Sequence, residues 1–159
     1  MERKGIKMVK GKVEEIVEKL NKALADEWLA YYQYWIGAKV VKGKFRNEVA
    51  SELKEHADEE LKHAEMLTDR IIQLGGTPVL KPEDWYKLTN CGYEAPIDAN
   101  VISVLKQNIK GEQCAIDVYQ NLAEYLKDKD PISYYMIIEI LGDEIEHEDD
   151  LINILEDIS

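Results

Sequence analysis

Four stretches of this sequence place apolar residues at alternating spacings of three and four, which brings them to one face of an α-helix. The stripes start at Val13, Val49, Val101 and Ile137, and each belongs to a helix of about 25–30 residues, roughly 38–45 Å long. Helices of this kind must bury their apolar faces against one another. Because the 159 residues also include only 9 Gly and 4 Pro, with 45% apolar residues, the sequence predicts one all-α domain and excludes disordered and collagen-like chains.

The breaks between the stripes fall where glycine and proline end helices. Lys42-Gly43-Lys44 separates the first helix from the second, and Asp128-Lys129-Asp130-Pro131 separates the third from the fourth, with Pro131 suited to a first helical turn. Between these hairpins lies a connector of residues 75–98, in which residues 82–86 form a candidate short helix. About 20 extended residues reach roughly 65 Å, enough to run the length of a bundle. The prediction is a ferritin-like four-helix bundle over residues 13–159, two antiparallel hairpins joined by a long crossover.

Each apolar stripe is interrupted near its middle by one glutamate: Glu27, Glu60, Glu112 and Glu144. Burying a carboxylate costs several kcal/mol unless it is paired or binds a metal. The distances to the turns predict that the four meet. The turn at Gly43 lies 16 residues after the first glutamate and 17 before the second, and Lys129 lies 17 after the third and 15 before the fourth. All four therefore lie at mid-bundle.

Two histidines complete the pattern, because His63 and His147 follow Glu60 and Glu144 by three residues. Positions i and i+3 share a helix face, so each Glu-x-x-His presents an oxygen and a nitrogen to the same interior. Four carboxylates balance two divalent cations, which predicts a dinuclear centre. Its mixed oxygen and nitrogen ligands suit iron or manganese, with zinc as a substitute. This is the known ligand pattern of ferritin-like dinuclear proteins, and Glu60 and Glu144 are the expected bridging carboxylates.

On these six residues, the chain resembles the bacterioferritin-like members of the ferritin superfamily over residues 10–158. Haem-binding bacterioferritins carry Met directly after the second-helix glutamate, where this chain has Leu61, so the resemblance implies no haem. Only 12 residues follow His147, too few for the fifth helix of the 24-subunit bacterioferritin shell. A homo-oligomeric shell of 12 subunits, as in Dps proteins, is expected instead.

The two cysteines narrow the resemblance. Cys114 lies two residues after Glu112 and so turns away from the bundle axis, which makes it a poor metal ligand, and Cys91 lies in the crossover. With a bacterioferritin-like centre and a Dps-like length, this placement is similar to that in Dps-like thioferritins. That resemblance implies a redox role for the pair. By themselves, two thiols in a chain without a signal peptide favour a reducing cytoplasm and inert packing, not a disulfide framework. The sequence leaves open whether they form a disulfide.

The function that the resemblance implies is a ferroxidase and iron-storage cage. Fe(II) would be oxidised at the dinuclear site by H2O2, or by O2, and the mineral stored, with protection against oxidative stress. One alternative is a dinuclear peroxidase or manganese catalase-like enzyme without storage. Another is a Dps-type protein that protects DNA through residues 1–12, a tail that holds five basic residues, although a solvated terminus is the favoured interpretation of that tail.

Charge and hydropathy bear on partners and location. The net charge of −12 disfavours DNA binding by the body of the protein. No apolar run reaches the roughly 18–20 residues of a membrane span, and the basic N-terminus leads into no apolar signal core. A cytoplasmic protein without a membrane partner is therefore expected.

Three further features have two interpretations each. Tyr34 lies on the first stripe, which indicates core packing, while the family resemblance makes it a candidate electron donor. His56 lies one turn before Glu60 and is either a group that supports the metal ligands or a core histidine. The acidic side chains around the fourth helix centre either line an access pore for cations or form a solvated face. These side chains are Glu146, Glu148, Asp149 and Asp150.

Overall fold

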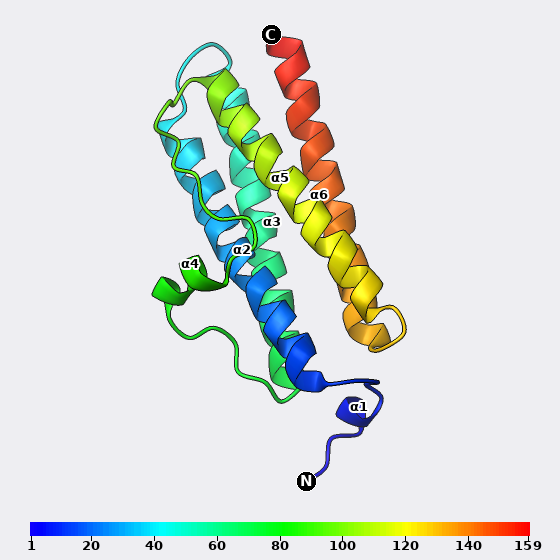
Figure 1. Ribbon diagram of the computed structural model, residues 1–159. Coiled ribbons are helices and arrows are strands. Elements are labelled where there is room, and N and C mark those ends of the chain that lie inside the picture. The colour runs from blue at the N-terminus through cyan, green and yellow to red at the C-terminus, as the bar shows by residue number, and fades with distance from the viewer.

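The computed structural model describes residues 1–159, which form a bundle of four long helices. Figure 1 shows how these helices are arranged. They are α2 (Val13–Val40), α3 (Arg46–Gln73), α5 (Val101–Leu126) and α6 (Pro131–Ile158). The shorter helices are α1 (Lys4–Lys7), η1 (Pro82–Asp84) and α4 (Trp85–Leu88). No strands form, and the predicted all-α, ferritin-like bundle is confirmed. None of these helices combines the length with the hydropathy that a membrane-spanning helix needs.

The helices pack as two hairpins. α2 packs most extensively against α3, and α5 against α6. The crossover between α3 and α5 runs along α2 and carries the predicted short helix, here η1 and α4, against it (Figure 1). The hairpins meet through α2 with α5 and through α3 with α6. These two contacts define two opposite faces of the bundle.

Helix boundaries follow the local chemistry. Asp130 caps α6 by accepting hydrogen bonds from the backbone N–H groups of Ile132 and Ser133, and Pro131 occupies the first turn. Gly43, with φ of 119°, reverses the chain between α2 and α3 as predicted. Phe45, with φ of 62°, is a second left-handed residue in this turn and was not expected, because a bulky side chain rarely adopts this conformation.

The basic tail contacts the end of the bundle. Lys10 N donates to the carbonyl of Lys129, and the Arg3 guanidinium donates to the carbonyl of Ile72. Val9 packs against the apolar core. These contacts hold the tail near the α5–α6 turn and the end of α3.

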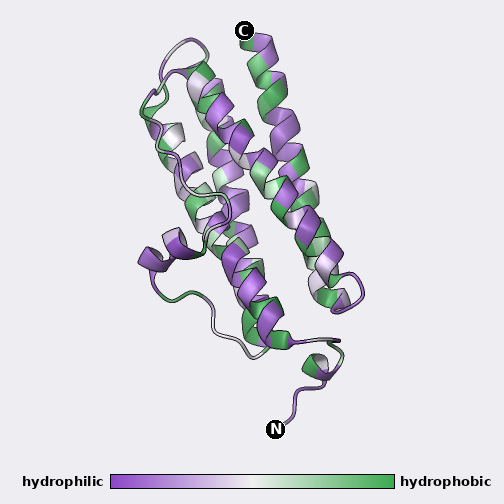
Figure 2. Ribbon diagram, in the orientation of Figure 1, coloured by the Kyte–Doolittle hydropathy of each residue, from purple (hydrophilic) through white to green (hydrophobic).

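Two separate apolar clusters make up the core. One, toward the α5–α6 turn, includes Ile16, Leu67 and Ile137, and the other, toward the α2–α3 turn, includes Val49, Leu105 and Leu151. Figure 2 shows hydrophilic and hydrophobic residues alternating along all four long helices. The side chains buried between the clusters are polar, and this polar layer contains the four stripe glutamates and His63 and His147.

Candidate metal centre

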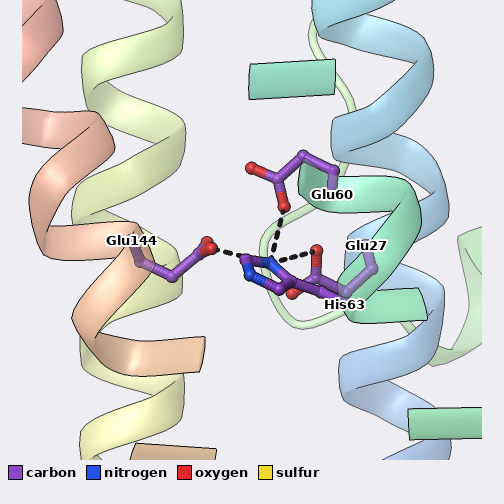
Figure 3. Close-up of side chains that lie close together, drawn as sticks. All are labelled: Glu27, Glu60, His63 and Glu144. Carbon is purple, nitrogen blue, oxygen red and sulfur yellow. Dashed lines mark ion pairs between the residues drawn. The ribbon is translucent and has the colours of Figure 1, made fainter. Parts of the chain in front are cut away.

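The bundle brings all six candidate ligands into its middle, one glutamate from each long helix and one histidine from each of α3 and α6. None is more than 3% exposed. Figure 3 shows Glu27, Glu60 and Glu144 around His63, from three different helices. The residue counts to the turns therefore predicted the height of these candidate ligands along the bundle. The helical period predicted the helix faces on which they lie.

The ligand atoms form two overlapping groups. Glu27 and His63 belong to one, Glu112 and His147 to the other, and Glu60 and Glu144 to both. Within each group the candidate ligand atoms lie within 4.8 Å of one another. The two shared glutamates lie where bridging carboxylates are expected.

The distances around each histidine are short enough for a common cation. His63 Nδ1 lies 3.1 Å from Glu144 Oε1, 3.4 Å from Glu60 Oε2 and 3.5 Å from Glu27 Oε2 (Figure 3). His147 Nδ1 lies 3.2 Å from Glu60 Oε1 and 3.5 Å from Glu112 Oε1. Ligands about 2.0–2.2 Å from one ion are separated by distances of this order.

The outer polar atoms of these residues are hydrogen-bonded, whereas the inner ones are not. Tyr119 OH donates to Glu27 Oε1 and Tyr34 OH donates to Glu112 Oε1. The second oxygens of both glutamates, the Nδ1 atoms of both histidines and both oxygens of Glu60 have no hydrogen-bond partner. Buried polar atoms without partners are rare in folded proteins. Two divalent cations would satisfy them together, and the residues therefore fit a dinuclear site.

Each histidine is oriented by a carboxylate from the opposite helix. His63 Nε2 lies 2.8 Å from Asp143 Oδ2 on α6, and His147 Nε2 lies 2.9 Å from Glu59 Oε2 on α3. A carboxylate accepts, so Nε2 of each ring carries a proton, and Nδ1 becomes the metal-binding nitrogen when a cation displaces the proton held there. Neither carboxylate was predicted to have this role, although each directly precedes the glutamate of a Glu-x-x-His motif.

The electrostatics show that the site without metal holds protons. Burial, together with the charge of Glu60, raises the pKa of Glu27, Glu112 and Glu144 above the usual carboxyl range. Burial alone would lower the pKa of His147, but the carboxylates of Glu112 and Glu60 raise it to about 12. Metal ions therefore have to displace protons, so affinity for the metal increases with pH.

The crossed tyrosine contacts repeat across the two halves of the chain. Tyr34 follows Glu27 by seven residues but donates to Glu112, and Tyr119 follows Glu112 by seven but donates to Glu27. Both are buried, and burial raises the pKa of both phenols well above the usual value. Both phenols therefore remain protonated donors that hold the two glutamates in place. This role of Tyr119 was not predicted from the sequence.

A cavity of about 440 Å³ leads to the centre between α2, α5 and the crossover. Its inner wall includes all four glutamates, and exposed Asn90, Glu94 and Lys110 lie at its outer edge. The cavity provides a path for small solutes from the surface to the candidate ligands.

Residues 17–159 match the Ferritin family, described as a ferritin-like domain. The chain belongs to the ferritin family. Its structure is similar to that of a dodecameric thioferritin, the bacterioferritin-related protein from Bacteroides fragilis, at 44% identity and a TM-score of 0.96. That similarity covers 99% of this ferritin and 95% of the B. fragilis chain.

Two relatives link this ferritin to two branches of the family. The DNA protection during starvation protein of Pyrococcus furiosus is 35% identical over 138 residues, 86% of this chain and 74% of the relative. The bacterioferritin of Streptomyces coelicolor is 30% identical over 136 residues, 85% of this chain and 76% of the relative. Membership of an iron-storage and ferroxidase family is therefore shown.

The two cysteines of this ferritin form a disulfide between the crossover and α5. The sequence left open whether these two cysteines are joined, and in this structure they are. The crossover is held in place beside them, since the Asp26 carboxylate on α2 accepts hydrogen bonds from the Thr89 hydroxyl and from the backbone N–H of Cys91. Cys91 and Cys114 both line the cavity, and neither belongs to the two ligand groups.

The acidic side chains predicted around the centre of α6 point in several directions. Glu148 accepts a hydrogen bond from Gln113, and Asp149 accepts one from Asn153. Glu146 is exposed. Asp150 instead approaches buried His56, with 3.5 Å between Oδ2 and Nε2. Within one subunit these residues do not converge on a common opening.

The outer carboxylates give a first testable prediction. Asp143→Asn removes the charge that orients His63, and we expect the initial rate of Fe(II) oxidation at limiting Fe(II) to fall about 10–100-fold. Glu139→Gln is the matched control, an exposed acid one turn earlier on α6. Stopped-flow absorbance of the ferric product measures both, and equal rates in the two variants would contradict the assigned role of Asp143.

Proposed function

We propose that this ferritin oxidises Fe(II) at an intrasubunit dinuclear site, with H2O2 as the preferred oxidant, and stores the product inside a shell of twelve copies. The observation that carries the proposal is the pattern of unpaired atoms. The inner atoms around the centre lack hydrogen-bond partners, and Glu60, shared by both groups, lacks partners on both oxygens. This is the arrangement that two adjacent cations require.

Fe(II) is the substrate, and the residues divide its binding between them. Glu27 and His63 hold one ion, Glu112 and His147 hold the other, and Glu60 and Glu144 bridge the pair. Two Fe(II) ions give one electron each to H2O2, whose O–O bond breaks, and two protons complete two water molecules. Paired one-electron donors avoid release of hydroxyl radical. Asp143 and Glu59 keep the imidazoles aligned, and the cavity beside α5 admits iron and peroxide.

The shell and the accessory residues complete the proposal. The dodecameric thioferritin at 44% identity supports twelve subunits, and one 159-residue chain has no interior for a mineral. The disulfide between Cys91 and Cys114 lines the cavity, which supports a redox role beside the centre. The hydrogen bond from Tyr34 to Glu112 supports a role for this phenol as an electron donor to the metal pair.

DNA protection is not part of the proposal. The name of the P. furiosus relative describes that protein and does not by itself assign DNA protection to this chain. In this chain Arg3 is bonded to the end of α3, and Lys7 forms an ion pair with Glu2, 2.7 Å apart. These contacts occupy two of the five basic side chains of the tail.

Iron loading tests the proposal. The apo-protein receives Fe(II) and H2O2 in excess, and iron per chain is counted in the oligomer peak after gel filtration. We expect tens of iron atoms per chain in a peak of twelve subunits. About two per chain would instead indicate a fixed dinuclear cofactor, as in a peroxidase, and would overturn storage. The consumption of about one H2O2 per two Fe(II) tests the oxidant separately, since O2 as the sole acceptor would leave peroxide unused.

A further inference from the structure

A second cluster of ligand-type side chains lies outside the dinuclear centre. It consists of Glu52 and His56, one turn apart on α3, and Asp150 on α6, and their candidate ligand atoms lie within 4.8 Å of one another. His56 Nε2 lies 3.1 Å from Glu52 Oε1 and 3.5 Å from Asp150 Oδ2. His56 is only 1% exposed, yet neither of its ring nitrogens has a hydrogen-bond partner. A buried imidazole aimed at two carboxylates without hydrogen bonds needs an explanation.

The fold itself does not require this polar cluster. The two hairpins are related by an internal repeat in which Glu60 and His63 correspond to Glu144 and His147, a shift of 84 positions. The same shift maps the three residues of the cluster onto Met136, Ile140 and Met66. Ile140 is fully buried in the apolar core, and both methionines pack against it. The equivalent place in the other half is thus filled by apolar side chains, and only one half carries the polar set.

We propose that Glu52, His56 and Asp150 form a third site, for a single divalent transition-metal cation. One imidazole nitrogen and two carboxylates neutralise a dication. Ions such as Fe(II), Mn(II) and Zn(II) take this nitrogen and oxygen mixture. Ligand atoms that lie about 2.0–2.2 Å from one cation are roughly 3.0–3.5 Å apart. The distances from His56 Nε2 to the Glu52 and Asp150 oxygens lie in this range.

The site lies next to the dinuclear centre on the other face of the bundle. The His56 ring stacks on that of His147, with 4.1 Å between ring centroids. The cavity opens between α2 and α5, whereas the cluster joins α3 to α6, the opposite face. The Glu52 side chain is 27% exposed and that of Asp150 is 42% exposed, so a cation reaches the cluster from solvent. The protein would therefore hold metal on both sides of the stacked His56 and His147 rings.

Zinc binding to the full-length protein tests the site, because Zn(II) is redox-inert and visible by anomalous scattering. Crystals of the wild-type protein soaked in ZnCl2 should show two peaks at the dinuclear centre and a third between Glu52, His56 and Asp150. His56→Ile introduces the residue found at the equivalent position, and Asp150→Asn removes one ligand charge. We expect both variants to lose the third peak alone and to bind about one Zn(II) fewer per chain.

Two matched control variants each remove one negative charge close to the cluster. Glu55→Gln and Asp149→Asn alter exposed acids on the same helix turns, and both should retain three zinc ions. Absence of a wild-type peak at the cluster, or a peak that persists in Asp150→Asn and His56→Ile, would overturn the third site. Loss of the two central peaks with the third retained would overturn the dinuclear centre instead, so failures of the two proposals are distinguishable.

Discussion

Glu60→Gln is expected to reduce the initial rate of Fe(II) oxidation by at least about 100-fold, to near that of Fe(II) in buffer. Glu60 is the residue with both oxygens unpaired and is common to both ligand groups, so its loss affects both irons at once. The substitution preserves the shape of the side chain and removes its charge. Stopped-flow mixing of apo-protein with Fe(II) and H2O2 measures the rate.

The control for this variant is Glu55→Gln, an exposed acid on the same helix, which should oxidise iron at the wild-type rate. Circular dichroism and gel filtration of both variants separate loss of chemistry from loss of structure. A folded, assembled Glu60→Gln protein with a rate within a few-fold of wild type would exclude Glu60 as a bridging ligand.

Arg70→Met is expected to lower the free energy of unfolding by about 3–5 kcal/mol. Arg70 is 9% exposed, and its Nη2 donates to both oxygens of Asp130 at 2.9 Å while its Nε donates to Ser133 at 2.8 Å. Its removal leaves the Asp130 carboxylate buried at the start of α6 without its cation. This contact joins the end of α3 to the start of α6, two elements that are distant in the sequence.

Guanidinium unfolding at fixed protein concentration measures the change, because assembly makes stability depend on concentration. Lys54→Met is the matched control. It breaks the exposed Lys54–Asp58 pair, whose side chains are 48% and 62% exposed, and should change stability by less than about 1 kcal/mol. Equal losses in the two variants would show that the Arg70 pair contributes no more than a surface contact.

Much of this architecture could be predicted because its causes are local in the sequence. The 3.6-residue period determines which side of each helix holds Glu27 or Glu112, and residue counts to Gly43 and Lys129 determine their height. Pro131 and Asp130 mark the start of α6 for the same reason. The candidate ligands could thus be brought together without knowledge of the packing.

Contacts between helices could not be predicted in this way. Whether Tyr119 reaches Glu27 or Glu112 depends on how each helix is rotated against its neighbours, which no single-helix pattern contains. The pairing of Arg70 with Asp130 depends on where two helix ends meet after the crossover. Asp143 and Glu59 were equally visible in the sequence, but an acid beside an acid on an acidic helix is typical of a solvated face.

The division of the core into two apolar clusters separated by a polar layer has a consequence for stability, because under the proposed function the fold would depend on the supply of iron. The apolar clusters at the ends of the bundle contain none of the candidate metal ligands, whereas the middle contains buried polar atoms without hydrogen-bond partners, which a cation would satisfy. A ligand that binds only the folded chain stabilises it by RT ln(1 + [L]/Kd). Under the proposed function, the iron-free chain is therefore less stable than the iron-loaded chain. Its least stable part is the middle of the bundle, where iron enters.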